Sequence, residues 1–338
     1  MDTILNTISI ANFTDLVRRE FQAVGTRVPR LADMLYIKDE RGLNNGEFAL
    51  YEEYDTDTFA SVKLQGENTT KARAGVGYSK QAKVRRFGIE IDITDEMRKF
   101  NKYPEVRAKL TNLTNYAPER MELDLTHRLT FASATTYVDR DGTTVDITVG
   151  DGLALASASH LLKYSGTTWS NLVSGAPSFS RTGLESAELL ASTNILNNFG
   201  EKRKMNFNVL FFADYPTTEN LVMELLQSTA SVASGINSNV KNVYQAKYKP
   251  LKLAYLATTA QGAYDATKRG YWGIVATGTD EGSWQAYFPT WEAPYLVDPI
   301  NTPSLIDGHA DIWTYGARCS YDIAIVSGRG CIISLASS

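Results

Sequence analysis

The chain has 338 residues, a hydrophobic fraction of 43% and a formal net charge of −4. This composition excludes a disordered chain, and the acidic balance disfavours non-specific nucleic-acid binding, which needs many Lys and Arg contacts with phosphates. Two cysteines, Cys319 and Cys331, exclude a disulfide framework and lie in apolar segments typical of buried thiols. No run of about 18 consecutive apolar residues predicts a membrane span.

Residues 1–44 are expected to form an extended arm that contains one short helix. The helix is indicated by apolar residues three or four positions apart, and Gly25 and Pro29 follow it. These apolar residues are Phe13, Leu16, Val17, Phe21 and Val24.

Residues 45–94 are predicted to form a long hairpin that projects from the body of the protein. Its outgoing leg begins at Phe48, its tip is small and polar from Gly66 to Gly77, and its return leg ends at Thr94 in an alternating strand pattern. Few large apolar side chains lie in the middle, so this region cannot bury a core of its own. Loops of this length are usually functional or reach a partner.

The charges of this hairpin are segregated. Two interpretations remain open: a basic arm that lies on the acidic surface of a neighbouring subunit, or a solvated loop whose surface ion pairs contribute little. The outgoing leg carries Glu52, Glu53, Asp55 and Asp57, and the tip and return leg carry Lys63, Lys71, Arg73, Lys80, Lys83, Arg85 and Arg86.

Residues 95–148 contain the longest predicted helix, from Pro104 to about Thr136. Pro104 suits the first turn of a helix. Pro118 removes one backbone hydrogen bond, so a bend or break is predicted near Asn115. A helix of about 50 Å is too long for one small core, and we expect a strut; a kinked core helix of an ordinary enzyme is the alternative. Its apolar stripe is Val106, Leu110, Leu113, Ala117, Met121, Leu125, Leu129 and Ala132.

Residues 149–291 are predicted to form a compact α/β subdomain, and residues 292–338 to return as strands. The sequence before them, Val138 to Val145, indicates a hairpin with an Asp-Gly turn. Within the subdomain we expect a helix capped by Thr182, a mobile loop at 228–242 and a second helix after Pro216. Expected strands lie at 208–212, 251–256, 271–276 and 284–288, and then between 309 and 333.

The order of these elements resembles the α+β fold of tailed-bacteriophage major capsid proteins, the Johnson fold. Local sequence is similar to the Mu-like major head subunit family, beginning with the Asp-Gly…Ser…His run from Asp151 to His160. A departure is that Pro216 comes later after its strand than in that family. The similarity continues in order through Asn171–Gly175, Phe179–Ser180, Leu184–Ala187, Asn208–Phe212, Asn220–Leu221 and Leu225–Leu226.

The resemblance implies a structural subunit that assembles as pentamers and hexamers into an icosahedral head around double-stranded DNA, without sequence-specific DNA contacts. Residues 45–94 would be the extended loop that crosses a neighbour, residues 95–148 the peripheral domain with its spine helix, and residues 149–291 the axial domain. Portal, scaffold and decoration proteins would be partners. The location would be the virion, after assembly in the cytoplasm of the bacterial host, with no membrane.

No catalytic or metal-binding pattern is found in the sequence. His127, His160 and His309 are far apart and have no companion at metal-ligand spacing. Glu52 and Glu53 are adjacent in a predicted strand and therefore point to opposite faces. We expect no enzyme and no cofactor; the alternatives are an encapsulin-type compartment and, more weakly, a soluble α/β enzyme.

Overall fold

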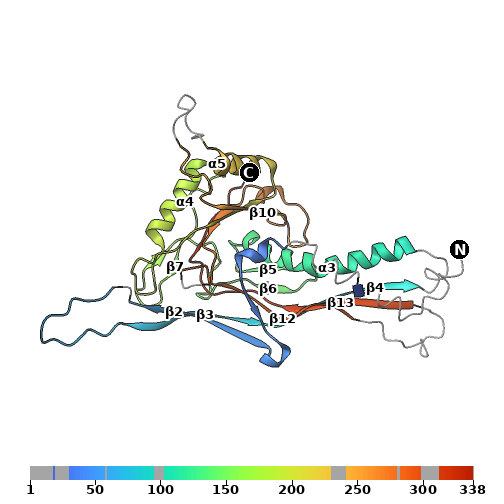
Figure 1. Cartoon of the computed structure of the whole chain (residues 1–338), viewed down its shortest axis with the longest axis horizontal. Coiled ribbons are helices and arrows are strands. Elements are labelled where there is room, and N and C mark those ends of the chain that lie inside the picture. The colour runs from blue at the N-terminus through green and yellow to red at the C-terminus, as the bar shows by residue number, and fades with distance from the viewer. Residues whose placement is uncertain are drawn as a thin grey trace.

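The computed structural model describes residues 18–19, 30–57, 59–94, 103–229, 241–279, 282–297 and 312–337. The predicted N-terminal helix, the loop at 228–242 and His309 lie wholly or mostly outside these ranges. The described chain is α+β, with a projecting hairpin on one side, a long helix on the other and an α/β dome between them (Figure 1).

The helices and strands follow the predicted order along the chain. Short 3₁₀ turns occur at η2 (Ala32–Leu35), η3 (Leu43–Asn45) and η4 (Ala266–Lys268). The longer helices are α3 (Tyr103–Thr130), α4 (Arg181–Asn194) and α5 (Pro216–Gln227). The strands are β1 (Ile37–Glu40), β2 (Phe48–Thr56), β3 (Ala74–Lys83), β4 (Arg85–Thr94), β5 (Thr136–Val138), β6 (Thr144–Asp146), β7 (His160–Leu161), β8 (Thr168–Trp169), β9 (Val209–Ala213), β10 (Lys249–Leu253), β11 (Trp272–Val275), β12 (Ala286–Val297), β13 (Ile312–Tyr321), β14 (Ala324–Ile325) and β15 (Cys331–Ser334).

Helix α3 buries its predicted apolar stripe against two separate cores. Its N-terminal half packs Leu110 and Leu113 against β4 and β13, and its C-terminal half packs Met121 and Leu125 into the main core. This confirms that one core does not wrap the helix. Of the bend or break predicted near Asn115, the break is wrong, because the helix continues through Pro118.

The end of α3 and its polar face also differ from the prediction. The helix ends at Thr130 rather than Thr136; a turn follows it, and Thr136 is the first residue of β5. Glu122, Asp124 and Arg128 are not part of the apolar stripe, yet they are buried. Each meets a partner that is distant in sequence, so the spacing of residues in the helix could not reveal its burial.

Two larger sheets organise the body. The five-stranded sheet has the order β1-β12-β13-β4, with β14 also paired to β12, and the four-stranded sheet has the order β10-β9-β11-β15. Helices α4 and α5 pack on one side of the four-stranded sheet through Leu184, Val222 and Leu226. The predicted helix start near Thr182 is confirmed, because α4 begins at Arg181, but the predicted cap is wrong: Ser180 is the N-cap, and its hydroxyl accepts from the Gly183 N–H.

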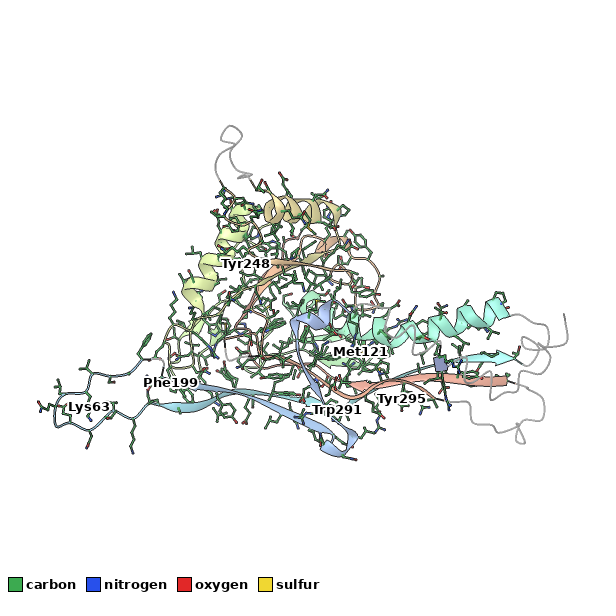
Figure 2. All side chains as sticks on the ribbon, viewed as in Figure 1. Lys63, Met121, Phe199, Tyr248, Trp291 and Tyr295 are labelled. Carbon is green, nitrogen blue, oxygen red and sulfur yellow. The ribbon has the colours of Figure 1, made fainter. Side chains whose placement is uncertain are left out.

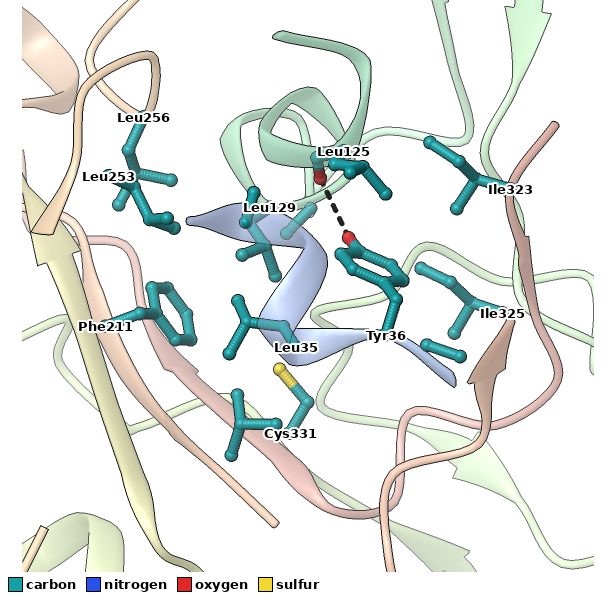
Figure 3. Packing of buried hydrophobic residues seen from close by; sticks show 14 of the residues in the cluster. Leu35, Tyr36, Leu125, Leu129, Phe211, Leu253, Leu256, Ile323, Ile325 and Cys331 are labelled. Atoms are coloured by element: carbon teal, nitrogen blue, oxygen red, sulfur yellow. Dashed lines mark hydrogen bonds between the residues drawn. The ribbon is translucent and has the colours of Figure 1, made fainter. Parts of the chain in front are cut away.

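The main core lies between the four-stranded sheet, the C-terminal half of α3 and the segment around η2. Leu35 enters it beside Leu129, Phe211 and Cys331, and the Tyr36 hydroxyl donates to the Leu125 carbonyl at 2.8 Å (Figure 3). Both cysteines are buried, as predicted. This packing fixes the body from which the hairpin projects.

Strands β2 and β3 form the projecting hairpin as a sheet of their own. The paired legs run from Phe48↔Lys83 to Thr56↔Ala74. The return leg therefore ends at Lys83 rather than Thr94, because β4 continues into the five-stranded sheet beside β13. The predicted tip, Gly66 to Gly77, is too long at its end: residues 74–77 belong to β3, and the turn lies near Gly66.

Candidate functional site

The two faces of strand β2 differ in chemistry. Alternate residues point to opposite sides of a strand, and here Ala49, Tyr51, Glu53 and Asp55 are buried. The other face exposes large apolar side chains, and beyond the strands the loop extends far from the body, with Lys63 near its end (Figure 2). The exposed apolar residues of the hairpin are Phe48, Leu50, Tyr54, Phe59, Val62, Leu64 and Val76.

The buried face of β2 carries two carboxylates that are clamped by arginines. Arg329 Nη1 lies 2.6 Å from Glu53 Oε1 and 3.2 Å from Asp55 Oδ2. Arg203 Nη1 lies 2.9 Å from Asp55 Oδ1. Burial raises the pKa of Glu53, while Arg329 opposes this shift. We call Glu53, Asp55, Asn198, Arg203 and Arg329 the anchor of the hairpin.

Asn198 completes the anchor with its side-chain amide. Its Nδ2 donates to Glu53 Oε2 at 3.0 Å and to Asp55 Oδ2 at 2.6 Å, and its Oδ1 accepts from Arg329 Nη2 at 2.8 Å. The Asn198 backbone N–H also donates to Asp55. The buried carboxylates are therefore compensated by both charge and hydrogen bonds, which buried charges require.

Two glycines place Arg329. Gly330 has φ +81°, and a Cβ there would lie 3.0 Å from the Trp284 backbone. A Cβ at Gly328 would lie 2.8 Å from Asn171 Nδ2 and 3.2 Å from His160 Nε2. The Gly328-Arg329-Gly330 sequence is thus a tight turn that places the buried Arg329 guanidinium at the base of the hairpin.

Two more glycines allow the hairpin to pass close to the body. A Cβ at Gly75 would lie 2.5 Å from the Tyr164 hydroxyl, and one at Gly77 would lie 2.6 Å from Asn198 Nδ2. Lys163 Nζ donates to the Val76 and Gly77 carbonyls at 3.0 and 2.7 Å. The role of these glycines is to allow this close approach.

Several of the predicted hairpin charges have partners within their own subunit. Asp57 pairs with Arg73, and Lys80 pairs with Asp146. Arg85 lies 3.6 Å from the buried Asp139. These pairs, together with the anchor, account for much of the charge segregation seen in the sequence.

The other predicted charges are exposed, apart from Glu52, which is half-buried. Glu52 accepts from the Tyr54 hydroxyl at 2.8 Å, and Lys83 lies over the Phe48 ring. Lys63, Lys71 and Arg86 are exposed, and no side-chain hydrogen bond or ion pair joins them to any residue in the described ranges.

The predicted spine helix, α3, contributes charged residues to a second buried cluster. Arg120 pairs with Asp139 and lies 3.1 Å from Asp124, whose other oxygen accepts from the Tyr321 hydroxyl at 2.7 Å. Burial raises the pKa of Asp124, opposed by Arg120. Glu122 accepts from the Ala32 N–H at 2.9 Å. The middle of α3 is therefore tied to the five-stranded sheet and to the chain near η2.

The histidines described by the structure have structural surroundings. His160 Nδ1 lies 2.7 Å from Asp151 Oδ2, and the ring stacks on Trp169. His127 is buried among Phe131 and Tyr137, with Nε2 3.3 Å from the Thr258 hydroxyl. Within the described ranges no three His, Cys, Asp or Glu side chains group as a metal site, and no helix is long and apolar enough to cross a membrane.

Sequence reasoning missed Asn198, Arg203 and Arg329. Their partners on β2 are more than 140 residues away in the chain, so no local spacing connects them. The available signal was the pair of glycines around Arg329, which is unusual for a strand-rich C-terminus.

Comparisons with known proteins gave results only among solved structures. No family model matches the chain, and no curated protein is similar to it. It is similar to a structure titled Gordonia phage Cozz at 9% identity and a TM-score of 0.49, over 91% of this chain and 87% of that one. It is also similar to the capsid of cyanophage P-SCSP1u at 11% identity and a TM-score of 0.48, over 90% and 87% of the two chains. The capsid of Ralstonia phage GP4 gives 11% identity and a TM-score of 0.48, over 90% and 88%.

Proposed function

We propose that the chain is a major capsid protein of a tailed bacteriophage, a structural subunit that self-assembles as pentamers and hexamers into an icosahedral head. The observation that carries this proposal is the hairpin: it exposes an apolar face and a basic tip, yet its base is anchored by buried charges. A single soluble chain gains nothing from exposing so much apolar surface, whereas a subunit covers it with copies of itself.

Each part of the subunit has its own role in the proposed shell. The hairpin (β2 and β3, with the loop between them) reaches a neighbouring subunit, with Lys63 and Lys71 available for its acidic groups. Helix α3 is the spine of a peripheral domain that also holds β4 and β13. The α/β dome with α4 and α5 is the axial domain, and it meets its copies around the fivefold and sixfold axes.

The head encloses double-stranded DNA without sequence-specific contacts. The net charge of −4 suits a shell that encloses DNA without binding its phosphates tightly. Portal, scaffold and decoration proteins are the further partners we propose, with assembly in the host cytoplasm. We propose no catalytic role: the buried carboxylates of the anchor are already bound by its arginines and by Asn198.

The test replaces the loop and leaves its anchor intact. Residues 59–72 are exchanged for Asn-Gly, which preserves the Asp57–Arg73 pair and the whole of β3. We expect a soluble, folded subunit that forms no stable closed shells, because the projecting contact is gone. The matched control, Lys202→Ala, changes an exposed lysine of the dome and should assemble normally.

Particle contents complete the test. Shells purified from infected cells should contain DNA, whereas a co-purified cargo enzyme in place of DNA would identify an encapsulin-type compartment. Heat-stable shells of normal size from the loop-replacement variant would contradict the role we assign to the hairpin.

A further inference from the structure

A pocket of about 560 Å³ lies where β4, α3 and the turn between β5 and β6 meet. Its apolar lining includes Phe87, Ile89 and Tyr116, and Ile89 and Tyr116 are partly exposed. Its volume is in the range of sites that bind small ligands or inserted side chains.

The arginines of this pocket fall into two kinds. Arg120 forms ion pairs with Asp124 and Asp139. Arg86 and Arg140 also line the pocket, and neither guanidinium has a hydrogen-bonding or ionic partner among the residues that the structure describes. Asp141 also lines the pocket, and its carboxylate accepts from the Thr143 N–H within its own turn. Because Arg86 and Arg140 outnumber this carboxylate, the pocket combines an apolar lining with a net positive charge, an arrangement suited to a carboxylate flanked by apolar side chains.

The exposed face of β2 carries a carboxylate flanked by apolar side chains. Leu50 and Tyr54 are each 59% exposed, and Glu52 lies between them on the same face because side chains alternate along a strand. The carboxylate of Glu52 is joined to the Tyr54 hydroxyl, and within the described ranges no Lys or Arg pairs with it. Its β3 neighbour across the hairpin is Ser79, which carries no charge.

We infer that this pocket receives the Leu50-Glu52-Tyr54 face of β2 from a second copy of the chain, with the Glu52 carboxylate bound by Arg86 and Arg140. This inference rests on the proposed function and names the residues of one contact between subunits. Within one chain both surfaces are exposed, so neither covers the other. A face and a different pocket make a heterologous contact, and such contacts generate rings when the rotation closes.

The inferred contact reverses the charge pattern suggested by the sequence. One of the two interpretations of the sequence was a basic arm that lies on the acidic surface of a neighbouring subunit. Here the paired section of the hairpin presents a carboxylate to a basic pocket, while the lysines at the tip remain available for other contacts.

A charge exchange tests the contact. Glu52→Arg and Arg86→Glu each place like charges in the interface, and each should raise the subunit concentration needed for assembly by about 10-fold or more. The double variant E52R/R86E restores opposite charges in a single chain and should recover most of the assembly. Arg140→Glu, alone and combined with Glu52→Arg, repeats the cycle at the second arginine.

The control is Glu47→Arg, the same charge reversal at another exposed carboxylate just before β2; it should assemble like the wild-type protein. Circular dichroism should confirm that all variants are folded, since Glu52 and Arg86 support no buried contact. If Glu52→Arg assembles normally, or the double variants are no better than the single ones, the inferred contact is wrong. In both cases shells formed by the wild-type chain would leave the proposed function intact.

Discussion

Arg329 and Glu53 are 276 positions apart in the chain, and their side chains meet at 2.6 Å in the interior of the protein. The contact joins the base of the projecting hairpin to a turn just before the last strand. Because Asn198 and Arg203 come from a third segment, the hairpin is fixed by the completed fold and not by its own sequence.

Removing the central arginine should therefore destabilise the whole subunit. Arg329→Ala leaves Glu53 and Asp55 buried with Arg203 as their remaining cation, and loss of one partner from a buried pair costs about 3–5 kcal/mol. Urea unfolding of the purified subunit measures this. Arg318→Ala is the control, because its pair with Glu90 is exposed on both sides and should contribute less than about 1 kcal/mol. Equal losses in the two variants would contradict a special role for the anchor.

Gly75 should tolerate no side chain while Tyr164 is present. A Cβ would lie 2.5 Å from the Tyr164 hydroxyl, so Gly75→Ala forces one of them to move, at a cost of about 1–3 kcal/mol. Thermal unfolding of Gly75→Ala, Tyr164→Ala and the double variant should show that Tyr164→Ala relieves most of the new strain. Gly42→Ala, where nothing lies within 4 Å, should be close to neutral. Strictly additive losses in the double variant would show that the two residues do not clash.

His127 should make the subunit less stable in mild acid. Burial lowers its pKa to about 4, so the unfolded chain, with the ordinary value near 6.5, binds the proton more readily. Its contribution is complete above about pH 6.5 and falls as the pH drops toward 4, by about 3 kcal/mol in all.

The comparison that isolates His127 is with His127→Gln. Glu122, Asp124 and Glu53 have raised pKa values, which act in the opposite sense over this range. The difference in unfolding free energy between wild type and variant should narrow by about 3 kcal/mol from pH 7 to pH 4. A difference independent of pH would mean that His127 has the same pKa in the fold as in the unfolded chain.

Features that depend on local residue patterns, such as the buried face of a helix or a tight turn, could be predicted from the sequence. The apolar stripe of α3 is buried at every predicted position, from Val106 to Ala132, and the Asp-Gly turn after Val138 forms with Gly142 at φ +82°. Asp151 and His160, which lie nine positions apart in the sequence, also meet, with His160 Nδ1 2.7 Å from Asp151 Oδ2.

Contacts between distant segments could not be predicted in this way. Asp124 lies outside the apolar stripe of its helix, and it is buried because Tyr321, from β13, lies against it. The hairpin was extended to Thr94 because β4 has the alternation of a strand, yet alternation does not say which strand is its partner. Ser180 replaced Thr182 as helix cap for a related reason: both have the right side chain, and the approach of the preceding chain decides between them.

The most direct measurement is negative-stain electron microscopy of the purified wild-type chain, together with a sizing column. The account predicts pentamers, hexamers or closed shells tens of nanometres across. A chain that stays a monomer or dimer at every concentration and salt, also when co-expressed with the scaffold protein of its own phage, would contradict it.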